Sequence, residues 1–457
     1  MHPKLPIGPE LTPDEQTFAW FSRPYVFLDE CAKKYGDTFT LNFKGLGEHV
    51  FFSHPDAIQE IFAGDPAVFY AGQGNSIIKP FLGNDSLLIL DGPNHARHRK
   101  MMGAAFHGQK MKPYLKLMIE STQYIISKIE VDTELTIHSL MLDISLEIIL
   151  RALFGTRNPE RFKQMKELLV PLLDFAGFST LVSTPDTQSS NPRDPWVQYQ
   201  RRSKELDRLL FEEVAEHKTI LGNPATSTSH EDDQSILGVL LAQTSETGQG
   251  FTDPELRDEL VTLLLAGHET TATVLTWAFY WIHSTEGVRP LLMQELNTLS
   301  GKTDSETLSK LSYLDGVVKE SLRIFPVIPV VSRKLQQSVT IAGINLPAEI
   351  QVTPCIYLVH HREELYPEPK RFNPERFVTK RYAPHEFLPF GGGARRCIGM
   401  AFGMLEMKTV LSLILSQIQL ELTDQSPVRP VRRTVTVSPS GGVRMKVKEK
   451  RLHNIEY

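Results

Sequence analysis

One ten-residue stretch decides how the chain is interpreted: Phe390-Gly391-Gly392-Gly393-Ala394-Arg395-Arg396-Cys397-Ile398-Gly399. It presents a cysteine on a glycine-rich turn, directly before an apolar run over residues 400–415 that has helical spacing. A helix N-terminus and neighbouring arginines both lower the pKa of a thiol, so Cys397 is expected to act as a thiolate ligand. Free cysteines are usually small buried hydrophobes, but that interpretation explains neither the glycines nor the arginines. An axial thiolate suits an iron porphyrin, because it pushes electron density toward the metal.

The pattern F-x-x-G-x-R-x-C-x-G is present without a departure. It resembles the haem-binding signature of the cytochrome P-450 superfamily, the haem-thiolate monooxygenases. The resemblance implies haem b as the cofactor, Cys397 as the iron ligand, and Phe390 and Arg395 as haem contacts. A glycine-rich turn can also cradle a phosphate, but the Walker pattern needs Lys and then Ser or Thr after its last glycine, and neither follows.

The composition of the 457 residues, 41% hydrophobic and 23% charged, is ordinary for a globular protein with a substantial core. A net charge of −5 gives no support to nucleic-acid binding. The three cysteines, Cys31, Cys355 and Cys397, are too scattered for a disulfide framework or a zinc site, which indicates a reducing compartment.

The first 17 residues carry prolines and acids rather than an apolar segment long enough for a signal peptide or a membrane span. We expect a soluble, cytoplasmic protein of bacterial type. Residues 1–457 are expected to form a single P-450 haem domain with a proline-containing lead over 1–20, no transmembrane anchor and no fused reductase.

Periodicity predicts a mainly α fold with a small β portion. Amphipathic runs predict helices over residues 110–129, 139–154, 158–175, 195–217 and 234–243. Strand patterns predict two hairpins, 39–43 with 49–53 and 339–342 with 350–354.

One long helix is predicted from Thr252-Asp253-Pro254-Glu255 to Gly287, with Pro290 beyond it. Thr252 and Glu255 have capping-box spacing, and the proline stands in the first turn. At about 1.5 Å per residue the helix would span roughly 50 Å. Its apolar runs over 260–266 and 274–281 predict passage through the core, and the resemblance implies that it crosses the haem.

A polar interruption lies inside that helix: Ala266-Gly267-His268-Glu269-Thr270-Thr271. It resembles the family's oxygen-activation motif, A-G-x-[DE]-T-T. The resemblance implies that Thr270 hydrogen-bonds dioxygen or its water, that Glu269 relays protons, and that Ala266 contacts the haem. Alternatively, the threonines satisfy the carbonyls four residues earlier. A zinc-protease H-E-x-x-H motif is excluded, because its second histidine position is Ala272.

Glu320 and Arg323 stand at i, i+3, which on an ordinary helix gives a surface ion pair worth a few tenths of a kcal/mol. The E-x-x-R spacing is a second family signature, and Phe372-Asn373-Pro374-Glu375-Arg376-Phe377 resembles the third. The resemblance implies a Glu320, Arg323 and Arg376 network that serves folding and haem retention.

Further cations match positions that neutralise haem propionates in the family. They are His95 and Arg99, which share a helical face, with Arg395 and Arg333. Arg97 and Lys100 are either solvated charges or, with Arg396, a basic patch for an acidic electron donor.

The resemblance also places substrate contacts at mostly apolar positions, which favours a lipophilic substrate such as a fatty acid or a terpenoid. These positions are Ile77, Ile78, Phe81, Leu82, Leu87, Leu88, Leu172, Phe175, Phe178, Leu181, Leu263, Ala266, Val327, Ile328, Val330 and Val331.

The resemblance implies a monooxygenase that inserts one atom of dioxygen into a C–H or C=C bond. Electrons would come from NAD(P)H through a separate ferredoxin or flavodoxin with its reductase. Two alternatives remain: a peroxide-using or isomerising haem-thiolate enzyme, and a non-catalytic haem-based sensor.

Overall fold

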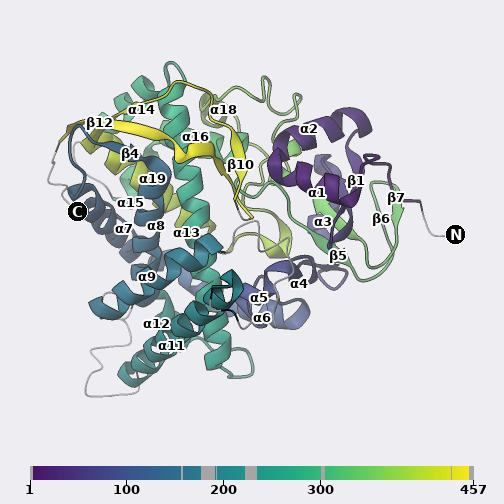
Figure 1. Ribbon diagram of the computed structural model, residues 1–457, viewed down its shortest axis with the longest axis horizontal. Coiled ribbons are helices and arrows are strands. Elements are labelled where there is room, and N and C mark those ends of the chain that lie inside the picture. The colour runs from purple at the N-terminus through teal and green to yellow at the C-terminus, as the bar shows by residue number, and fades with distance from the viewer. Residues whose placement is uncertain are drawn as a thin grey trace.

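The structure, a computed structural model, is mainly helical with a small β portion, as the sequence predicts (Figure 1). It describes residues 4–155, 158–175, 191, 193–221, 234–299, 304–433 and 435–451. In Figure 1 the N-terminal helices lie beside strands β1, β5, β6 and β7 at the right, and long helices fill the left.

The helices are α1 (Pro13–Ser22), α2 (Pro24–Tyr35), α3 (Pro55–Ala63), α4 (Ala71–Gly74), α5 (Lys79–Leu82), α6 (Gly92–Gly103), α7 (Met111–Ser127), α8 (Ile137–Phe154), α9 (Pro159–Phe175), α11 (Pro195–Leu221), α12 (Ile236–Ala242), α13 (Asp253–Ser284), α14 (Val288–Leu296), α15 (Ser305–Lys310), α16 (Ser312–Ile324), α17 (Ile356–Val359), α18 (Glu375–Thr379) and α19 (Met400–Gln417). The strands are β1 (Thr38–Phe43), β2 (Gly47–Phe52), β3 (Phe69–Tyr70), β4 (Glu134–Thr136), β5 (Arg333–Leu335), β6 (Val339–Ile341), β7 (Ile344–Leu346), β8 (Gln351–Pro354), β9 (Ile418–Leu422), β10 (Pro430–Arg432), β11 (Val437–Pro439) and β12 (Arg444–Lys450). Each helix predicted from periodicity is present, with ends that differ by at most four residues.

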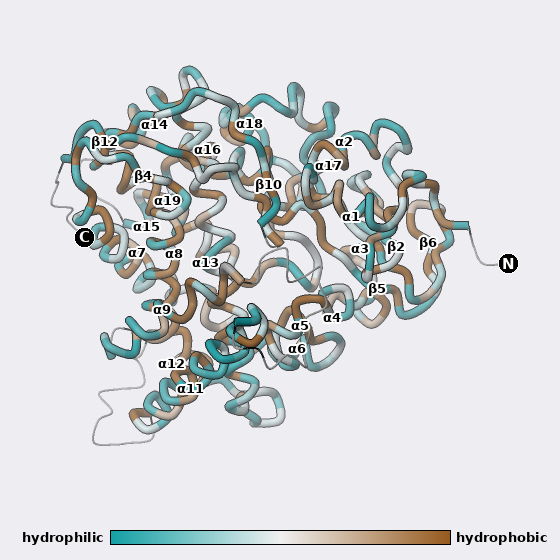
Figure 2. Tube along the Cα trace, in the orientation of Figure 1, coloured by the Kyte–Doolittle hydropathy of each residue, from teal (hydrophilic) through white to brown (hydrophobic). Residues whose placement is uncertain are grey.

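The core of the helical part is built around α13, which packs on α8, α16 and α19. Its C-terminal half is apolar on every side, and Trp277 and Phe279 are fully buried there. Brown, hydrophobic stretches run along α8 and α13, whereas α11 itself has more teal, hydrophilic residues (Figure 2). A helix that is apolar all round must lie inside the protein, which explains the course of α13.

Both ends of α13 have identifiable local causes. The Thr252 backbone N–H donates to Glu255 Oε2 at 2.8 Å, and the Glu255 N–H donates back to Thr252 Oγ1, so the predicted capping box is confirmed. The predicted C-terminus at Gly287 is wrong, since α13 ends at Ser284. Gly287 has φ +81° and caps the start of α14, and Pro290 lies in the first turns of that helix, where a missing N–H costs little.

The largest sheet has the strand order β1-β2-β8-β5-β3. The predicted hairpin of β1 and β2 is confirmed. The second predicted hairpin is wrong: β6 pairs with β7 around Ala342 and Gly343, both at positive φ, and β8 instead pairs in parallel with β2. A two-residue turn with positive φ closes a tight hairpin, which leaves the next strand free to join the large sheet.

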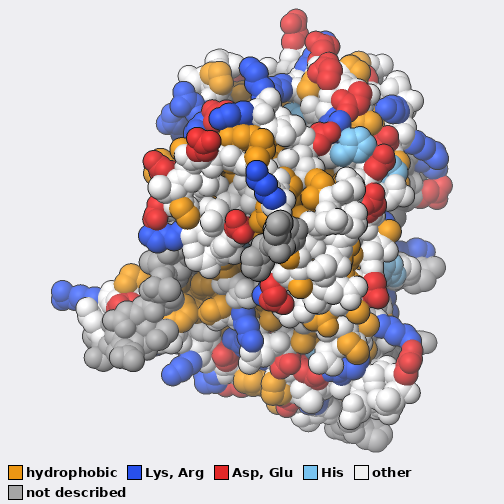
Figure 3. Space-filling view, turned by 90° about the vertical axis from the view of Figure 1, so that its right-hand side faces the viewer, with side chains coloured by type: hydrophobic (Ala, Val, Ile, Leu, Met, Phe, Trp, Pro, Cys, Tyr) orange, Lys and Arg blue, Asp and Glu red, His pale blue; other side chains and the backbone are white. Residues whose placement is uncertain are grey.

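Two surface properties bear on function. Within the described ranges, no helix is long and apolar enough to cross a membrane. On the face drawn in Figure 3, Lys and Arg side chains are interspersed with Asp and Glu, and that face carries no field of a single sign that would attract nucleic acid.

Candidate active site

The loop before α19 is folded by its own backbone. The Cys397 N–H donates to the Phe390 carbonyl at 2.9 Å, and the Gly391 N–H donates to the Leu388 carbonyl at 3.0 Å. Gly393 has φ +63°, and a Cβ there would lie 2.2 Å from the Phe62 carbonyl oxygen. A Cβ at Gly392 would lie 2.3 Å from the Phe62 ring. The glycines therefore let the loop turn sharply and lie directly against α3.

The Cys397 side chain is accessible, yet protein surrounds it on most sides. Burial raises the pKa of its thiol, and this effect outweighs the lowering by the Gly399 N–H, Arg99 and Arg396. The prediction of a lowered thiol pKa is therefore wrong for the protein alone. Ionisation of Cys397 requires a stronger positive charge, and a coordinated metal ion deprotonates a thiol outright.

Three guanidinium groups and a histidine gather beside this loop. His95 on α6, Arg333 at the start of β5 and Arg395 line one pocket together with Phe62 and Gly92. His95 Nε2 is buried without a hydrogen-bond partner among the described residues. Burial, with Arg395, Arg99 and Arg333 nearby, lowers the pKa of His95 to about 3.

Burial also lowers the pKa of Arg333 and of Arg395, each to about 10. Asp91 is the carboxylate that offsets this positive charge, through Arg395. An excess of buried cations with an orphaned imidazole nitrogen fits a ligand that carries carboxylates, as the two propionates of a haem do.

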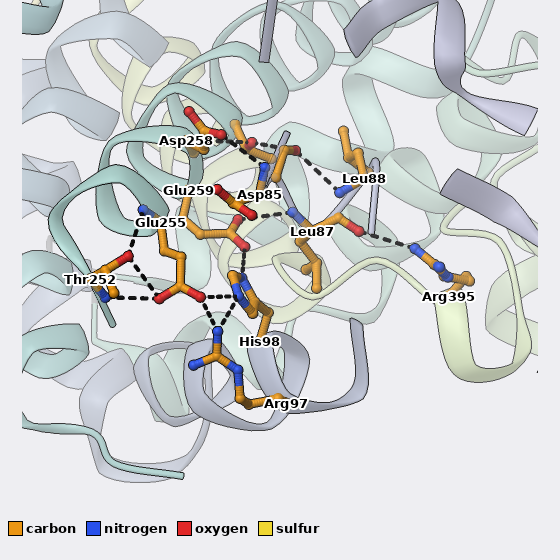
Figure 4. Close-up of polar contacts among 12 residues, drawn as sticks. Asp85, Leu87, Leu88, Arg97, His98, Thr252, Glu255, Asp258, Glu259 and Arg395 are labelled. Atoms are coloured by element: carbon orange, nitrogen blue, oxygen red, sulfur yellow. Dashed lines mark hydrogen bonds and ion pairs between the residues drawn. The ribbon is translucent and has the colours of Figure 1, made fainter. Parts of the chain in front are cut away.

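Arg395 is fixed by the loop that precedes α6. Its Nη1 donates to the Leu87 carbonyl at 3.0 Å (Figure 4). Its Nη2 donates to Asp91 at 2.5 Å and to the Leu90 carbonyl. Arg99 donates from Nη2 to the Arg396 carbonyl at 2.6 Å. The cations predicted from the sequence are thus brought together, and Arg99 also braces the cysteine loop.

The polar residues 266–271 of α13 lie on more than one face of the helix. Ala266 is exposed and Thr270 is partly exposed, and the Thr270 hydroxyl donates to the Ala266 carbonyl at 2.7 Å. This is the self-satisfied arrangement that the sequence left open as an alternative. Glu269 Oε1 accepts a hydrogen bond from Thr436 Oγ1 at 2.9 Å, a partner 167 residues away.

His268 and Gly267 serve packing against α8. His268 Nε2 lies 3.1 Å from the Leu142 carbonyl, and burial lowers the pKa of His268 to about 4. A Cβ at Gly267 would lie 3.1 Å from Ile149, so the glycine permits close approach of the two helices. On another face of α13, Thr271 Oγ1 lies 3.9 Å from the Cβ position of Gly403 on α19. The helix that carries Glu269 and Thr270 therefore touches the helix that follows Cys397.

The Glu320, Arg323 and Arg376 network is present, and its central pair is fully buried. Arg323 binds Glu320 through two hydrogen bonds of 2.6 and 2.8 Å, and Arg376 Nε donates to Glu320 Oε1 at 3.1 Å. Arg323 also donates to the His360 carbonyl. The pair is not the surface contact that an isolated i, i+3 spacing would give.

The basic patch is only partly as expected. Arg97 is only partly solvated, with its side chain 26% exposed: it forms an ion pair with Glu255 of α13 and lies over the Phe251 ring. This pairing could not be foreseen, because 158 residues separate the two partners. Lys100 is exposed and pairs with Glu246 at 2.7 Å, and Arg396 is exposed.

A mostly apolar pocket lies between α5, α9, α11 and α13. Phe81 and Leu172, both expected at the substrate site, line it. The pocket also contains residues that were not predicted from the sequence: Leu169, Tyr199, Ser203, Leu206, Arg257 and Val261. Tyr199, Ser203 and Leu206 stand at i, i+4 and i+7 on α11, and this helical spacing is the signal that could have identified these three. Phe178 and Leu181 lie outside the described residues.

A glycine-rich cysteine loop that leads into α19, packed against the helix that carries Glu269 and Thr270, is the arrangement expected of a haem-thiolate protein. The cytochrome P450 family model matches residues 14–447. The chain belongs to the cytochrome P450 family.

Relatives and solved structures agree with this family. The chain is 35% identical to putative cytochrome P450 135B1 of Mycobacterium bovis over 98% of this chain and 92% of the relative. It is 31% identical to putative cytochrome P450 135A1 of Mycobacterium tuberculosis, over 97% and 95%. The solved structure of retinoic acid-bound cyanobacterial CYP120A1 superposes with a TM-score of 0.83, at 26% identity, over 98% of this chain and all of that one. The cytochrome P450DA haem domain, at 22% identity and a TM-score of 0.85 over 99% of both chains, shows the same fold.

The protein is therefore an oxidoreductase, a haem-thiolate monooxygenase that uses dioxygen and electrons from redox partners.

Proposed function

We propose that this enzyme inserts one atom of dioxygen into a lipophilic substrate, such as a fatty acid or a terpenoid. Electrons would pass from NAD(P)H through a ferredoxin or flavodoxin and its reductase. One observation carries the proposal: His95, Arg333 and Arg395 line one pocket beside the cysteine loop, Arg99 binds that loop at the Arg396 carbonyl, and α13, which carries Glu269 and Thr270, packs on α19, the helix that follows Cys397.

The residues of the site fit haem b within one haem domain. Cys397 would ligate the iron, and Phe390 and Ala266 would contact the haem. His95, Arg99, Arg333 and Arg395 would neutralise the propionates. When bound, the haem supplies the iron at which dioxygen is reduced and split.

Glu269 and Thr270 would manage protons on the distal side. The Thr270 hydroxyl donates to the Ala266 carbonyl, so its oxygen can still accept a hydrogen bond from a neighbouring water or acid. Glu269, held by Thr436, can relay protons toward Thr270.

Apolar residues support a lipophilic substrate. The pocket between α5, α9, α11 and α13 is lined mostly by leucines, with Tyr199, Ser203 and Arg257 as its polar members, and such a lining suits an apolar ligand. The structural relative CYP120A1 was solved with retinoic acid, itself an apolar molecule with one polar end.

The intact Glu269 and Thr270 pair favours dioxygen chemistry over peroxide use or isomerisation, which need no proton delivery to reduced oxygen. The test compares product formed with NAD(P)H, ferredoxin and reductase against product formed with peroxide alone. Candidate substrates come from a screen of long-chain fatty acids and terpenes for a shift of the ferric Soret band toward high spin. Strict dependence on peroxide contradicts the proposal. A failure to form product with any compound, in wild type and Thr270→Ala alike, supports the sensor instead.

A further inference from the structure

Three acids on the first turns of α13 point inward and each holds another segment (Figure 4). Glu255 pairs with Arg97 and Asp258 pairs with Arg257. Glu259 is fully buried, and its Oε1 lies 2.6 Å from Nδ1 of His98 on α6. The His98 side chain is 1% exposed.

Two of these acids hold the backbone of residues 85–91, the segment between α5 and α6. The Asp85 N–H donates to Asp258 Oδ2 at 2.8 Å, and the Leu87 N–H donates to Glu259 Oε2 at 3.2 Å. Thr262 adds a hydrogen bond of 2.6 Å to Ser86 Oγ. The segment is therefore attached to α13 by side chains that aim at its backbone.

The other side of the same segment holds Arg395. The carbonyls of Leu87 and Leu90 and the carboxylate of Asp91 all accept from its guanidinium. Leu87 is thus held at its N–H by Glu259 and itself holds Arg395 through its carbonyl, as Figure 4 shows.

A buried carboxylate at position 259 is costly, and burial raises its pKa against the lowering by His98 and the Leu87 N–H. An apolar side chain would pack there without that cost, but it would leave the Leu87 N–H buried without an acceptor. Buried polar groups of this kind fix one geometry rather than add stability.

We propose that Glu259, oriented by His98, is a positioning residue that fixes residues 85–91 and through them aims Arg395 at a haem propionate. This inference rests on the proposed haem site. It assigns the His98–Glu259 pair a role in retaining haem although neither side chain is among the residues that line the cation pocket.

The test measures haem transfer from the ferric holoenzyme to an excess of apomyoglobin. Glu259→Leu removes the acceptor, and transfer is expected to accelerate about ten-fold, the effect of one lost charge-assisted hydrogen bond. Glu259→Gln keeps an oxygen for the Leu87 N–H, and its amide can donate to the other tautomer of His98, so transfer is expected within about two-fold of wild type. Glu213→Leu is the matched control, because it also removes a buried carboxylate, the partner of Arg161, and has no contact with His98 or residues 85–91 among those that the structure describes.

A double variant separates positioning from general stability. If Glu259 acts through Arg395, Glu259→Leu adds less than about two-fold in an Arg395→Gln background. The full acceleration in that background overturns the proposal, as does wild-type transfer in Glu259→Leu or equal acceleration in Glu259→Gln.

If little Glu259→Leu holoenzyme forms, resonance Raman spectra of the haem-bound fraction decide. The propionate bending bands should shift as they do in Arg395→Gln, and unshifted bands overturn the proposal. The reduced carbon monoxide spectrum of the wild type is recorded first, because a failure of the haem-thiolate site itself appears there.

Discussion

The hydroxyl of Thr436 donates to the carboxylate of Glu269 at 2.9 Å, and so joins the hairpin of β10 and β11 to the middle of α13. The hairpin therefore reaches the residue proposed to relay protons. A carboxylate that relays protons must be held in place yet stay able to exchange partners, and the Thr436 hydroxyl contributes a neutral hydrogen bond to that hold.

Thr436→Val should remove one of the hydrogen bonds that position Glu269 and partly uncouple oxygen reduction from product formation. The loss of a hydrogen bond to a charged group predicts about a ten-fold fall in product formed per electron pair. Peroxide released per NAD(P)H consumed is the measurement. Thr436→Ser keeps the hydroxyl and should behave as wild type, and equal coupling in Thr436→Val contradicts the role.

Thr270→Ala and Glu269→Gln should each lower the rate of product formation by about 10²-fold, the usual scale of general acid–base catalysis. Substrate affinity, read from the spin-state shift, should stay unchanged. Thr276→Ala is the matched control, because Thr276 makes the same 2.7 Å bond to the carbonyl four residues before it on the same helix. A comparable fall in rate for Thr276→Ala would show a general effect on the helix.

Arg323→Leu should destabilise the protein by about 3–5 kcal/mol, because it leaves Glu320 buried and without its closest cation. Haem content after expression and the thermal midpoint of the holoenzyme measure this effect. The double variant Glu320→Leu, Arg323→Leu should lose less than the sum of the two single changes. Additive losses would mean that the two side chains act independently.

Glu406 on α19 predicts a pH dependence of stability. Burial raises its pKa to about 8, against the lowering by the Ser145 hydroxyl, whereas an unfolded glutamate has an ordinary pKa of 4.5. Between these values the folded state holds a proton that the unfolded state has released, so stability falls as pH rises from about 4.5 to 8. This contribution is complete below pH 4.5 and lost above pH 8.

The thermal midpoints of wild type and Glu406→Gln should diverge between pH 5 and pH 8, with the variant gaining relative stability at the higher pH. Ser145→Ala is the companion variant, since it removes the hydrogen bond and keeps the carboxyl. Curves that stay parallel over this range contradict the raised pKa.

The features that could be predicted from the sequence are those that depend on residues close together in the chain. The capping box of Thr252 and Glu255, the glycine turn around Cys397 and the apolar period of α8 are local, and the structure confirms each. The cysteine motif then indicated the family, and the family resemblance predicted which residues bind haem.

Contacts between distant segments could not be read in this way. Arg97 was expected to be a surface charge, because no residue near it in the sequence indicates that it forms an ion pair with Glu255. Strand β8 was expected to pair with β6 across a longer loop. The chain instead turns within the two residues Ala342 and Gly343, so β7 becomes the partner of β6. The thiol of Cys397 was expected to ionise from its visible neighbours, but burial by the whole fold decides its pKa.

The central claim is that Cys397 ligates haem iron as a thiolate, and the reduced carbon monoxide spectrum tests it most directly. The wild type should show the red-shifted Soret band that defines haem-thiolate proteins, and Cys397→Ser should lose it while Cys355→Ser, a change at a buried cysteine elsewhere, keeps it. A wild-type protein that binds haem and lacks this band, or a Cys397→Ser protein that retains it, would contradict the account.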